Sequence, residues 1–182
     1  QQLAGDTTPD GGSAIARQAI VDEKGAVFGY ELFDRTRPGR SHDAASDAQL
    51  LFNVLSHADN GALIDNRTMF VNCAHDSLAS GHLELVQPDR IVLEIPPVAG
   101  DAPQEIERRL QGLTDARKRG FRLAFNQTVL HAAYATWLPL ANFIKVDLML
   151  LRSEQIKPVI VLAGKKSSAR LIVEKVETAE QH

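Results

Sequence analysis

Residues 90–129, RIVLEIPPVAGDAPQEIERRLQGLTDARKRGFRLAFNQTV, contain the pattern that decides the fold class. The apolar run at residues 90–96 and the alternating apolar residues at 121–126 are typical of short strands. The charged stretch between them, residues 101–120, has the period of a helix. A strand, a helix and a second strand in this order predict two parallel strands joined by a crossover helix.

The helix at residues 101–120 is the clearest single element that the sequence predicts. Its apolar stripe consists of Ile106, Leu110 and Leu113. We expect Asp101 to cap its start, because a carboxylate accepts hydrogen bonds from the free N–H groups of the first turn. Pro103 suits that first turn, and Gly120 is expected to end the helix.

The alternation of strands and helices continues on both sides of this unit. Further strands are expected at residues 14–22, 26–33, 68–74, 142–150 and 169–176, and further helices at 47–58, 132–140 and 153–166. The first two strands are joined by Glu-Lys-Gly, which predicts an antiparallel hairpin. Residues 1–13 are polar and lack a period, so we expect a flexible tail or linker there and one α/β domain over residues 14–182. An open parallel sheet and a closed barrel both fit this order of elements.

Composition excludes several classes of protein. The chain has 182 residues, 44% of them hydrophobic, which is enough for one domain with a substantial core. A net charge of −3 provides no general attraction to nucleic acid polymers or to membranes, and no apolar run approaches the roughly 20 residues that span a bilayer. The single cysteine, Cys73, cannot form an internal disulfide, which fits a cytoplasmic location. The two usual glycine-rich phosphate-loop motifs and a His-x-x-x-His pair do not occur, which disfavours a nucleotide-binding open sheet and a histidine-based zinc site.

Polar residues recur at or near the C-terminal ends of the predicted strands. They are Glu31, Asn72, Glu94, Asn126, Gln127, Lys145, Asp147 and Glu174. In parallel barrels these ends meet at one rim, where functional residues gather. Because Lys145 and Asp147 are two residues apart, they are expected to point to the same face of their strand. Several carboxylates and an amide oxygen at one rim suit a hard cation such as Mg²⁺, which activates water and neutralises phosphate oxygens.

Each of these residues also has a simpler interpretation. A single polar group at a strand end is most often a cap or a rim salt bridge, and Lys145 with Asp147 could form only an internal ion pair. Asn126 and Gln127 could belong to an ordinary turn. The repetition across consecutive strands is what favours a site. Other notable side chains are expected in the core (Cys73, Trp137 and Phe143) or at the surface and in loops (His75 and His131).

Six motifs in order resemble those of EAL domains, the bacterial phosphodiesterases and receptors of cyclic di-GMP. The motifs are GYELFDR, FVNCA, IVLEIP, FRLAFNQ, LANFIKVD and IVEKVETAEQ, and they extend over most of residues 15–182. RQAIVDEKGAVFGYELFDR and VLEIPP are most similar to the branch in which an EAL-like domain precedes an HDOD domain. The resemblance implies a TIM-barrel-like α/β fold in which one strand runs antiparallel.

The resemblance also implies roles for individual residues. Active EAL domains use two Mg²⁺ or Mn²⁺ ions to hydrolyse one phosphodiester bond of cyclic di-GMP, giving pGpG. The residues at the metal-ligand positions are Glu31, Asn72, Glu94, Asp147 and, in degenerate form, Asn126. Those at the catalytic positions are Lys145 and Glu174, and those at the substrate-binding positions are Arg35, Gln127 and Glu177.

The largest departure from the EAL pattern is at residues 126–137, NQTVLHAAYATW. Asn126 and Gln127 stand where active members have two aspartates, and the glycine-containing loop that follows those aspartates is missing. Pro97 replaces a glutamate that anchors the substrate loop, and Lys175 replaces a glycine. The sequence also stops soon after Glu177, so we expect the last strand of the family barrel to be lacking.

We therefore expect a degenerate EAL-type signalling domain that is catalytically inactive and has no metal cofactor. Its expected partners are cyclic di-GMP, a protein partner or a following HDOD-type domain, and a second copy in a homodimer. The alternative is an active phosphodiesterase that depends on Mg²⁺ or Mn²⁺. A third possibility is a receptor that binds cyclic di-GMP without metal.

Overall fold

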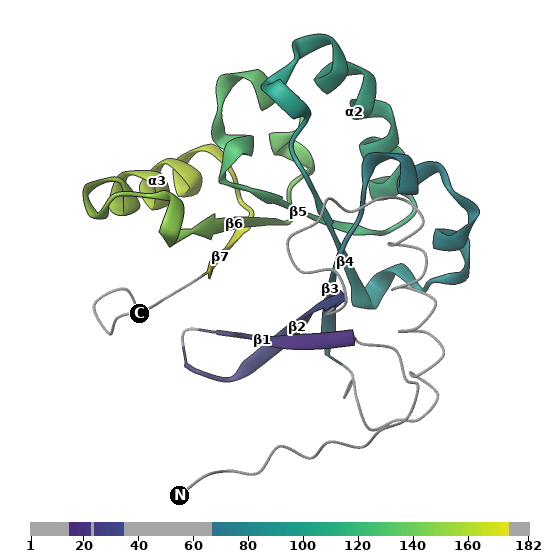
Figure 1. Cartoon of the computed structure of the whole chain (residues 1–182), viewed down its shortest axis with the longest axis horizontal. Coiled ribbons are helices and arrows are strands. Elements are labelled where there is room, and N and C mark those ends of the chain that lie inside the picture. The colour runs from purple at the N-terminus through teal and green to yellow at the C-terminus, as the bar shows by residue number, and fades with distance from the viewer. Residues whose placement is uncertain (1–14, 23, 35–66, 175–182) are drawn as a thin grey trace, which may run out of the picture.

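The computed structural model describes residues 15–22, 24–34 and 67–174 (Figure 1). Seven strands form one sheet in chain order: β1 (Ile15–Val21), β2 (Val27–Asp34), β3 (Thr68–Asn72), β4 (Ile91–Ile95), β5 (Arg122–Asn126), β6 (Phe143–Asp147) and β7 (Arg170–Glu174). β1 pairs with β2 antiparallel, and every later neighbour pairs parallel. The predicted hairpin and the TIM-barrel-like α/β fold with one antiparallel strand are confirmed. β1 and β7 are the outer strands of this order.

In the part of the chain that the structure describes, two α-helices lie against the sheet, α2 (Pro103–Lys118) beside β4 and β5 and α3 (Ser153–Lys166) beside β6 and β7 (Figure 1). Side chains of both helices join a large buried cluster on the outer face of the sheet. Leu113 of α2 and Ile144 of β6 are completely buried there. The tail expected at residues 1–13 and the helix expected at residues 47–58 lie outside the described residues.

Three local predictions are wrong. The strand expected at residues 142–150 ends at Asp147, and Leu148–Leu150 form a 3₁₀ turn. Asp101 does not cap α2, whose N-cap is Ala102 without a side-chain hydrogen bond. Asp101 has a φ of 50°, and its carboxylate accepts a hydrogen bond from the Tyr134 hydroxyl at 2.6 Å. The single helix expected at residues 132–140 is two 3₁₀ turns, Ala132–Tyr134 and Leu138–Leu140. Tyr134 and Trp137 are both buried with ring centroids 4.9 Å apart, and the tighter backbone brings residues three apart onto one side.

β2 and β3 approach each other closely at Gly29. A Cβ atom on this glycine would lie 2.5 Å from the carbonyl oxygen of Thr68, its partner in the ladder. A larger residue would therefore force the two strands apart. The close pairing keeps β2, and with it Glu31, in register with the parallel part of the sheet.

The inner face of the sheet is built in two layers. The residues of the apolar layer are Ile20, Phe28, Phe70, Val92, Ala124, Phe143 and Ile172. Those of the polar layer, nearer the C-terminal ends of β2 to β7, are Glu31, Asn72, Glu94, Asn126, Lys145 and Glu174. On β3 to β7 the polar residue follows the apolar one by two positions, so both face the same way. The apolar layer is thus the floor beneath the polar layer.

Burial bears out the predicted core residues. Cys73, Trp137 and Phe143 are all buried. His131 is exposed, as expected, whereas His75 is half-buried and stacks on Trp137 with ring centroids 5.3 Å apart. Among the described residues, no helix has the length and apolar character needed to cross a bilayer.

Candidate functional site

A cavity of about 470 Å³ lies at the C-terminal ends of the strands, above the apolar layer. The residues that line it are Glu31, Asn72, Cys73, Glu94, Ile95, Pro96, Pro97, Ala124, Phe125, Asn126, Lys145 and Glu174. Most of the predicted site residues are therefore brought together, although they come from strands far apart in the sequence. This is the end of a parallel barrel at which binding and catalysis are usually found.

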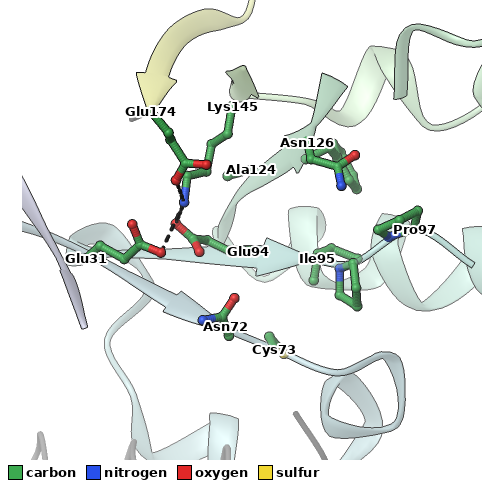
Figure 2. A pocket seen from close by; sticks show the side chains of 12 residues that line it. Glu31, Asn72, Cys73, Glu94, Ile95, Pro97, Ala124, Asn126, Lys145 and Glu174 are labelled. Atoms are coloured by element: carbon green, nitrogen blue, oxygen red, sulfur yellow. Dashed lines mark hydrogen bonds and ion pairs between the residues drawn. The ribbon is translucent and has the colours of Figure 1, made fainter. Parts of the chain in front are cut away.

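Lys145 lies at the centre of the charged part of this cavity (Figure 2). Its Nζ atom is 2.5 Å from an oxygen of Glu174, 2.8 Å from Glu94 and 3.2 Å from Glu31. Only 9% of the lysine side chain is exposed. Burial alone lowers the pKa of Lys145, but the carboxylates of Glu94, Glu31 and Glu174 outweigh it and the net pKa is raised. Lys145 is thus a permanently charged ammonium shared by three carboxylates.

Glu94 is the most deeply buried of the three glutamates. Burial raises the pKa of Glu94 to about 7, Lys145 opposes this rise, and the negative charges of Glu31 and Glu174 reinforce it. Near neutral pH the Glu94 carboxyl therefore lies between its acid and its carboxylate form. The pair of β3 and β4 places Asn72 directly opposite Glu94 in the ladder.

The carboxamides at the end of β5 hydrogen-bond to the backbone. Asn126 Oδ1 accepts from the N–H of Thr128 at 2.9 Å, and Gln127 Oε1 accepts from the N–H of Asp147 at 2.9 Å. The carboxylate of Asp147 in turn accepts from the N–H of Met149 at 2.9 Å. In Figure 2, Asn126 lies apart from the glutamates around Lys145. Both strand ends are thus closed by side-chain caps.

The predicted site residues separate into three groups by position. Glu31, Asn72, Glu94, Asn126, Lys145 and Glu174 line the cavity. Gln127 and Asp147 connect the segments after β5 and β6, beside the cavity. Arg35 and Glu177 lie outside the described residues. The simpler interpretation of Lys145 and Asp147 as an internal ion pair is wrong, because Lys145 forms its ion pairs with the three glutamates.

The side chains of the polar layer, as arranged, do not fit a divalent metal ion. No group of three His, Cys, Asp or Glu side chains in the described ranges is placed to hold one. The three glutamates converge on the Lys145 ammonium, and the amide groups of Asn72 and Asn126 carry no formal charge. Hard divalent ions require charged oxygen ligands, so the donor set matches a carboxylate cluster neutralised by lysine better than a metal centre.

A second group of residues holds the cavity rim and was missed by the sequence reasoning. The Tyr134 hydroxyl accepts from the N–H of Val98 at 3.0 Å, and it also donates to Asp101. His75 Nε2 lies 2.9 Å from the carbonyl oxygen of Pro96, which lines the cavity. These contacts fasten the segment after β4 to two distant parts of the chain. Partners 21 to 36 residues apart leave no periodic signal in the sequence.

Comparison with known proteins identifies relatives of this arrangement. No family model matches the chain. It is 28% identical over 177 residues to a Vibrio cholerae protein named cyclic di-GMP phosphodiesterase CdgJ, a match that covers 92% of this chain and 39% of that protein. The chain thus spans well under half the length of this curated relative.

Solved structures with the same fold include several with nucleotide bound. Klebsiella pneumoniae BlrP1, in a complex with calcium and cyclic di-GMP, has a TM-score of 0.71 and 19% identity, covering 98% of this chain and 53% of BlrP1. The Bacillus subtilis YkuI protein, described as having an EAL domain and bound to cyclic di-GMP and calcium, has a TM-score of 0.66 and 22% identity, with coverage of 92% and 50%. This chain has the fold of an EAL domain.

Proposed function

We propose that this chain is a degenerate EAL-type signalling domain that does not hydrolyse cyclic di-GMP and acts as a partner-binding module or cyclic di-GMP-related regulator. The observation that carries this proposal is the pair of neutral carboxamides, Asn126 and Gln127, at two positions where the EAL pattern has aspartates.

The geometry at the end of β5 agrees with this proposal. Both carboxamide oxygens accept backbone hydrogen bonds, that of Asn126 from Thr128 and that of Gln127 from Asp147. An amide oxygen can contact a cation but contributes no formal charge to hold it. Losing two negative charges at the end of β5 should greatly weaken a two-metal cluster, and losing a metal-bound nucleophile commonly costs orders of magnitude in rate.

The cavity supports a retained capacity to bind a small ligand. Its volume of about 470 Å³ falls within the roughly 300–1,000 Å³ of typical small-molecule sites. BlrP1 and YkuI, which share the fold, were solved with cyclic di-GMP bound. Arg35 is the proposed phosphate contact, since a guanidinium binds phosphate oxygens bidentately. Binding without turnover would suit a regulatory role.

The test is titration of cyclic di-GMP with and without Mg²⁺ or Mn²⁺, followed by chromatography of the products. We expect the dinucleotide to remain intact under both conditions. Formation of pGpG at a rate that Glu31→Ala abolishes would overturn the proposal. The Glu31→Ala control distinguishes turnover in this cavity from a contaminating phosphodiesterase.

An active phosphodiesterase is the second candidate function. It is favoured by the retention of Glu31, Asn72, Glu94, Lys145 and Glu174 in one cavity and by the 28% identical CdgJ. In this alternative, metal-dependent turnover requires Lys145 to release the glutamates. The same chromatographic assay separates the two candidates, because only an active enzyme produces pGpG.

A third candidate is a receptor that binds cyclic di-GMP without metal. Binding that is independent of Mg²⁺ in the same titration would favour it.

We further propose that this domain interacts with a protein partner, with an HDOD-type domain that follows in the same protein, or with a second copy of itself. Size-exclusion chromatography with light scattering, at concentrations that span the range of the titration, tests the homodimer directly.

A further inference from the structure

Arginines gather at the N-terminal ends of the strands, the end of the sheet opposite the cavity. Arg122 is the first residue of β5, and Arg170 is the first residue of β7. Each lies two positions before a residue of the apolar layer, Ala124 or Ile172, so both arginines face the same way as that layer. Arg90, directly before β4, adds a third positive charge at this end.

The guanidinium groups of Arg122 and Arg170 lie on rings of the apolar layer. The Cζ atom of Arg122 is 5.9 Å from the centre of the Phe143 ring. The Cζ atom of Arg170 is 4.4 Å from the centre of the Phe28 ring. These two rings are neighbours, with centroids 5.9 Å apart. A guanidinium that stacks by its face keeps N–H donors around its edge, so the two arginines present donors over one continuous apolar surface.

Arg122 carries a half-buried charge that its hydrogen bonds do not neutralise. Its Nη2 atom donates to the carbonyl oxygen of Asp89 at 2.9 Å and to the hydroxyl of Thr68 at 3.3 Å. Within the described residues, neither Arg122 nor Arg170 forms an ion pair with a carboxylate. Burial lowers the pKa of Arg122, and the negative charge of Asp89 opposes this shift. Because a partly buried cation is costly without a counter-charge, this place favours an anion.

The acidic side chains nearest to this end are engaged elsewhere or point to solvent. The carboxylate of Asp22 accepts from the N–H groups of Lys24 and Ala26, each at 2.9 Å, and so belongs to the hairpin turn between β1 and β2. Asp89 is exposed and offers Arg122 its backbone carbonyl oxygen. A ligand is therefore needed to supply the negative charge.

We propose that Arg122 and Arg170 form a binding site for the phosphate group of a small molecule. A guanidinium binds phosphate oxygens through two parallel hydrogen bonds. A tetrahedral phosphate has oxygens that point in several directions and can accept from both arginines at once, whereas a carboxylate has two oxygens in one plane. The site lies at the other end of the strands from the cavity and does not rest on the proposed function.

The test is titration of the wild-type chain with inorganic phosphate, at constant ionic strength and mildly alkaline pH, followed by amide chemical shifts in NMR spectra. We expect saturable shifts at the amides of Thr68, Arg122 and Arg170, and not at those of the cavity. Malonate, also a dianion at this pH, should bind more weakly because its oxygens lie in two planar groups. Shifts that stay linear with phosphate concentration, or equal affinity for malonate, would overturn the proposal.

Three variants locate the site and separate it from a general effect of charge. Arg170→Gln should weaken phosphate binding about tenfold, and the fold should be retained because this arginine is exposed on an outer strand. Arg122→Lys keeps the charge but lacks the planar fork, and should weaken binding by a smaller factor. Arg108→Gln, at an exposed arginine on α2, changes the net charge equally and should leave the affinity unchanged. Undiminished binding by Arg170→Gln would contradict the proposal.

Discussion

The polar and apolar layers on the inner face of the sheet are two residues apart on the same strands, yet they are held together by different forces. Phe143 and Lys145 on β6 illustrate the contrast. Phe143 packs its ring edge-on against Phe70 with centroids 5.1 Å apart, and burial of apolar surface stabilises both. Lys145 is nearly as buried but is held by three carboxylates whose desolvation opposes folding.

The difference indicates that the apolar layer stabilises the fold, whereas the polar layer carries the groups that are capable of chemistry. The apolar layer needs no ligand to be complete, and arginines stack on its rings from the N-terminal side, Arg122 over Phe143 and Arg170 over Phe28. The polar layer concentrates ionisable groups around a cavity at substantial energetic cost. Groups that are costly to bury are usually retained for function or specificity rather than for stability.

The largest effect is expected from truncating the apolar layer. Phe70 is fully buried and contacts the rings of both Phe28 and Phe143. Phe70→Ala should lower the free energy of unfolding by about 3–5 kcal/mol, because it removes buried apolar surface and leaves a cavity. Urea denaturation followed by circular dichroism measures this loss. Phe70→Leu is the matched control and should cost markedly less, because it keeps most of the apolar volume, whereas equal losses would contradict the assignment of the loss to buried apolar surface and a cavity.

A smaller and pH-dependent effect is expected from the polar layer at Glu94. Burial raises the pKa of Glu94 from its ordinary 4.5 to about 7, so the folded chain binds this proton more tightly than the unfolded chain. The resulting stability is complete below about pH 4.5 and is lost as pH rises through about 7. Since one pKa unit is worth about 1.4 kcal/mol, the loss amounts to roughly 3–4 kcal/mol.

The measurement compares wild type with Glu94→Gln by urea denaturation across this pH range. As pH rises through this range, the unfolding free energy of the wild type should fall by roughly that amount relative to that of Glu94→Gln. Burial lowers the pKa of His75, but this histidine is common to both chains and its contribution cancels in the difference. A difference that stays constant with pH would mean that Glu94 is not desolvated in the folded protein.

The sequence predicted the strands and most of the polar layer, but it did not predict the role of Asp147. Apolar runs interrupted by one polar residue near each strand end located the strands and most of the polar layer, because alternation in a strand decides which face a side chain occupies. The same rule placed Asp147 on the face of Lys145. At the last position of β6, however, its carboxylate caps the turn Leu148–Leu150.

The rim contacts could not be predicted from the sequence for a different reason. Tyr134 and Asp101 are 33 residues apart, and their hydrogen bond depends on a left-handed backbone at Asp101 that sequence periodicity does not report. The sequence instead favoured Asp101 as a helix cap, the commonest use of an aspartate before a proline-initiated helix. Long-range partners of single polar side chains emerge only once the fold has brought them together.

A moderate loss of stability is expected from removing the Tyr134 hydroxyl at the rim of the cavity. Tyr134→Phe removes a hydroxyl that donates to Asp101 and accepts from Val98, and leaves the N–H of Val98 without that acceptor. We expect a loss of about 1–2 kcal/mol in unfolding free energy. Hydrogen exchange at the Val98 amide should accelerate as well. Tyr30→Phe, at a half-buried tyrosine on β2, is the control, and unchanged exchange at Val98 would contradict the proposed fastening.

The smallest effect is expected from restoring one charge at the end of β5. Asn126→Asp preserves the side-chain acceptor for the N–H of Thr128, so stability should change by less than about 1 kcal/mol. The added carboxylate should raise the affinity of the cavity for Mn²⁺, because hard divalent ions depend on the charge of their oxygen ligands. Calorimetry with Mn²⁺ measures the change. An affinity equal to that of the wild type would contradict the assignment of a weakened metal site to the lost charge on β5.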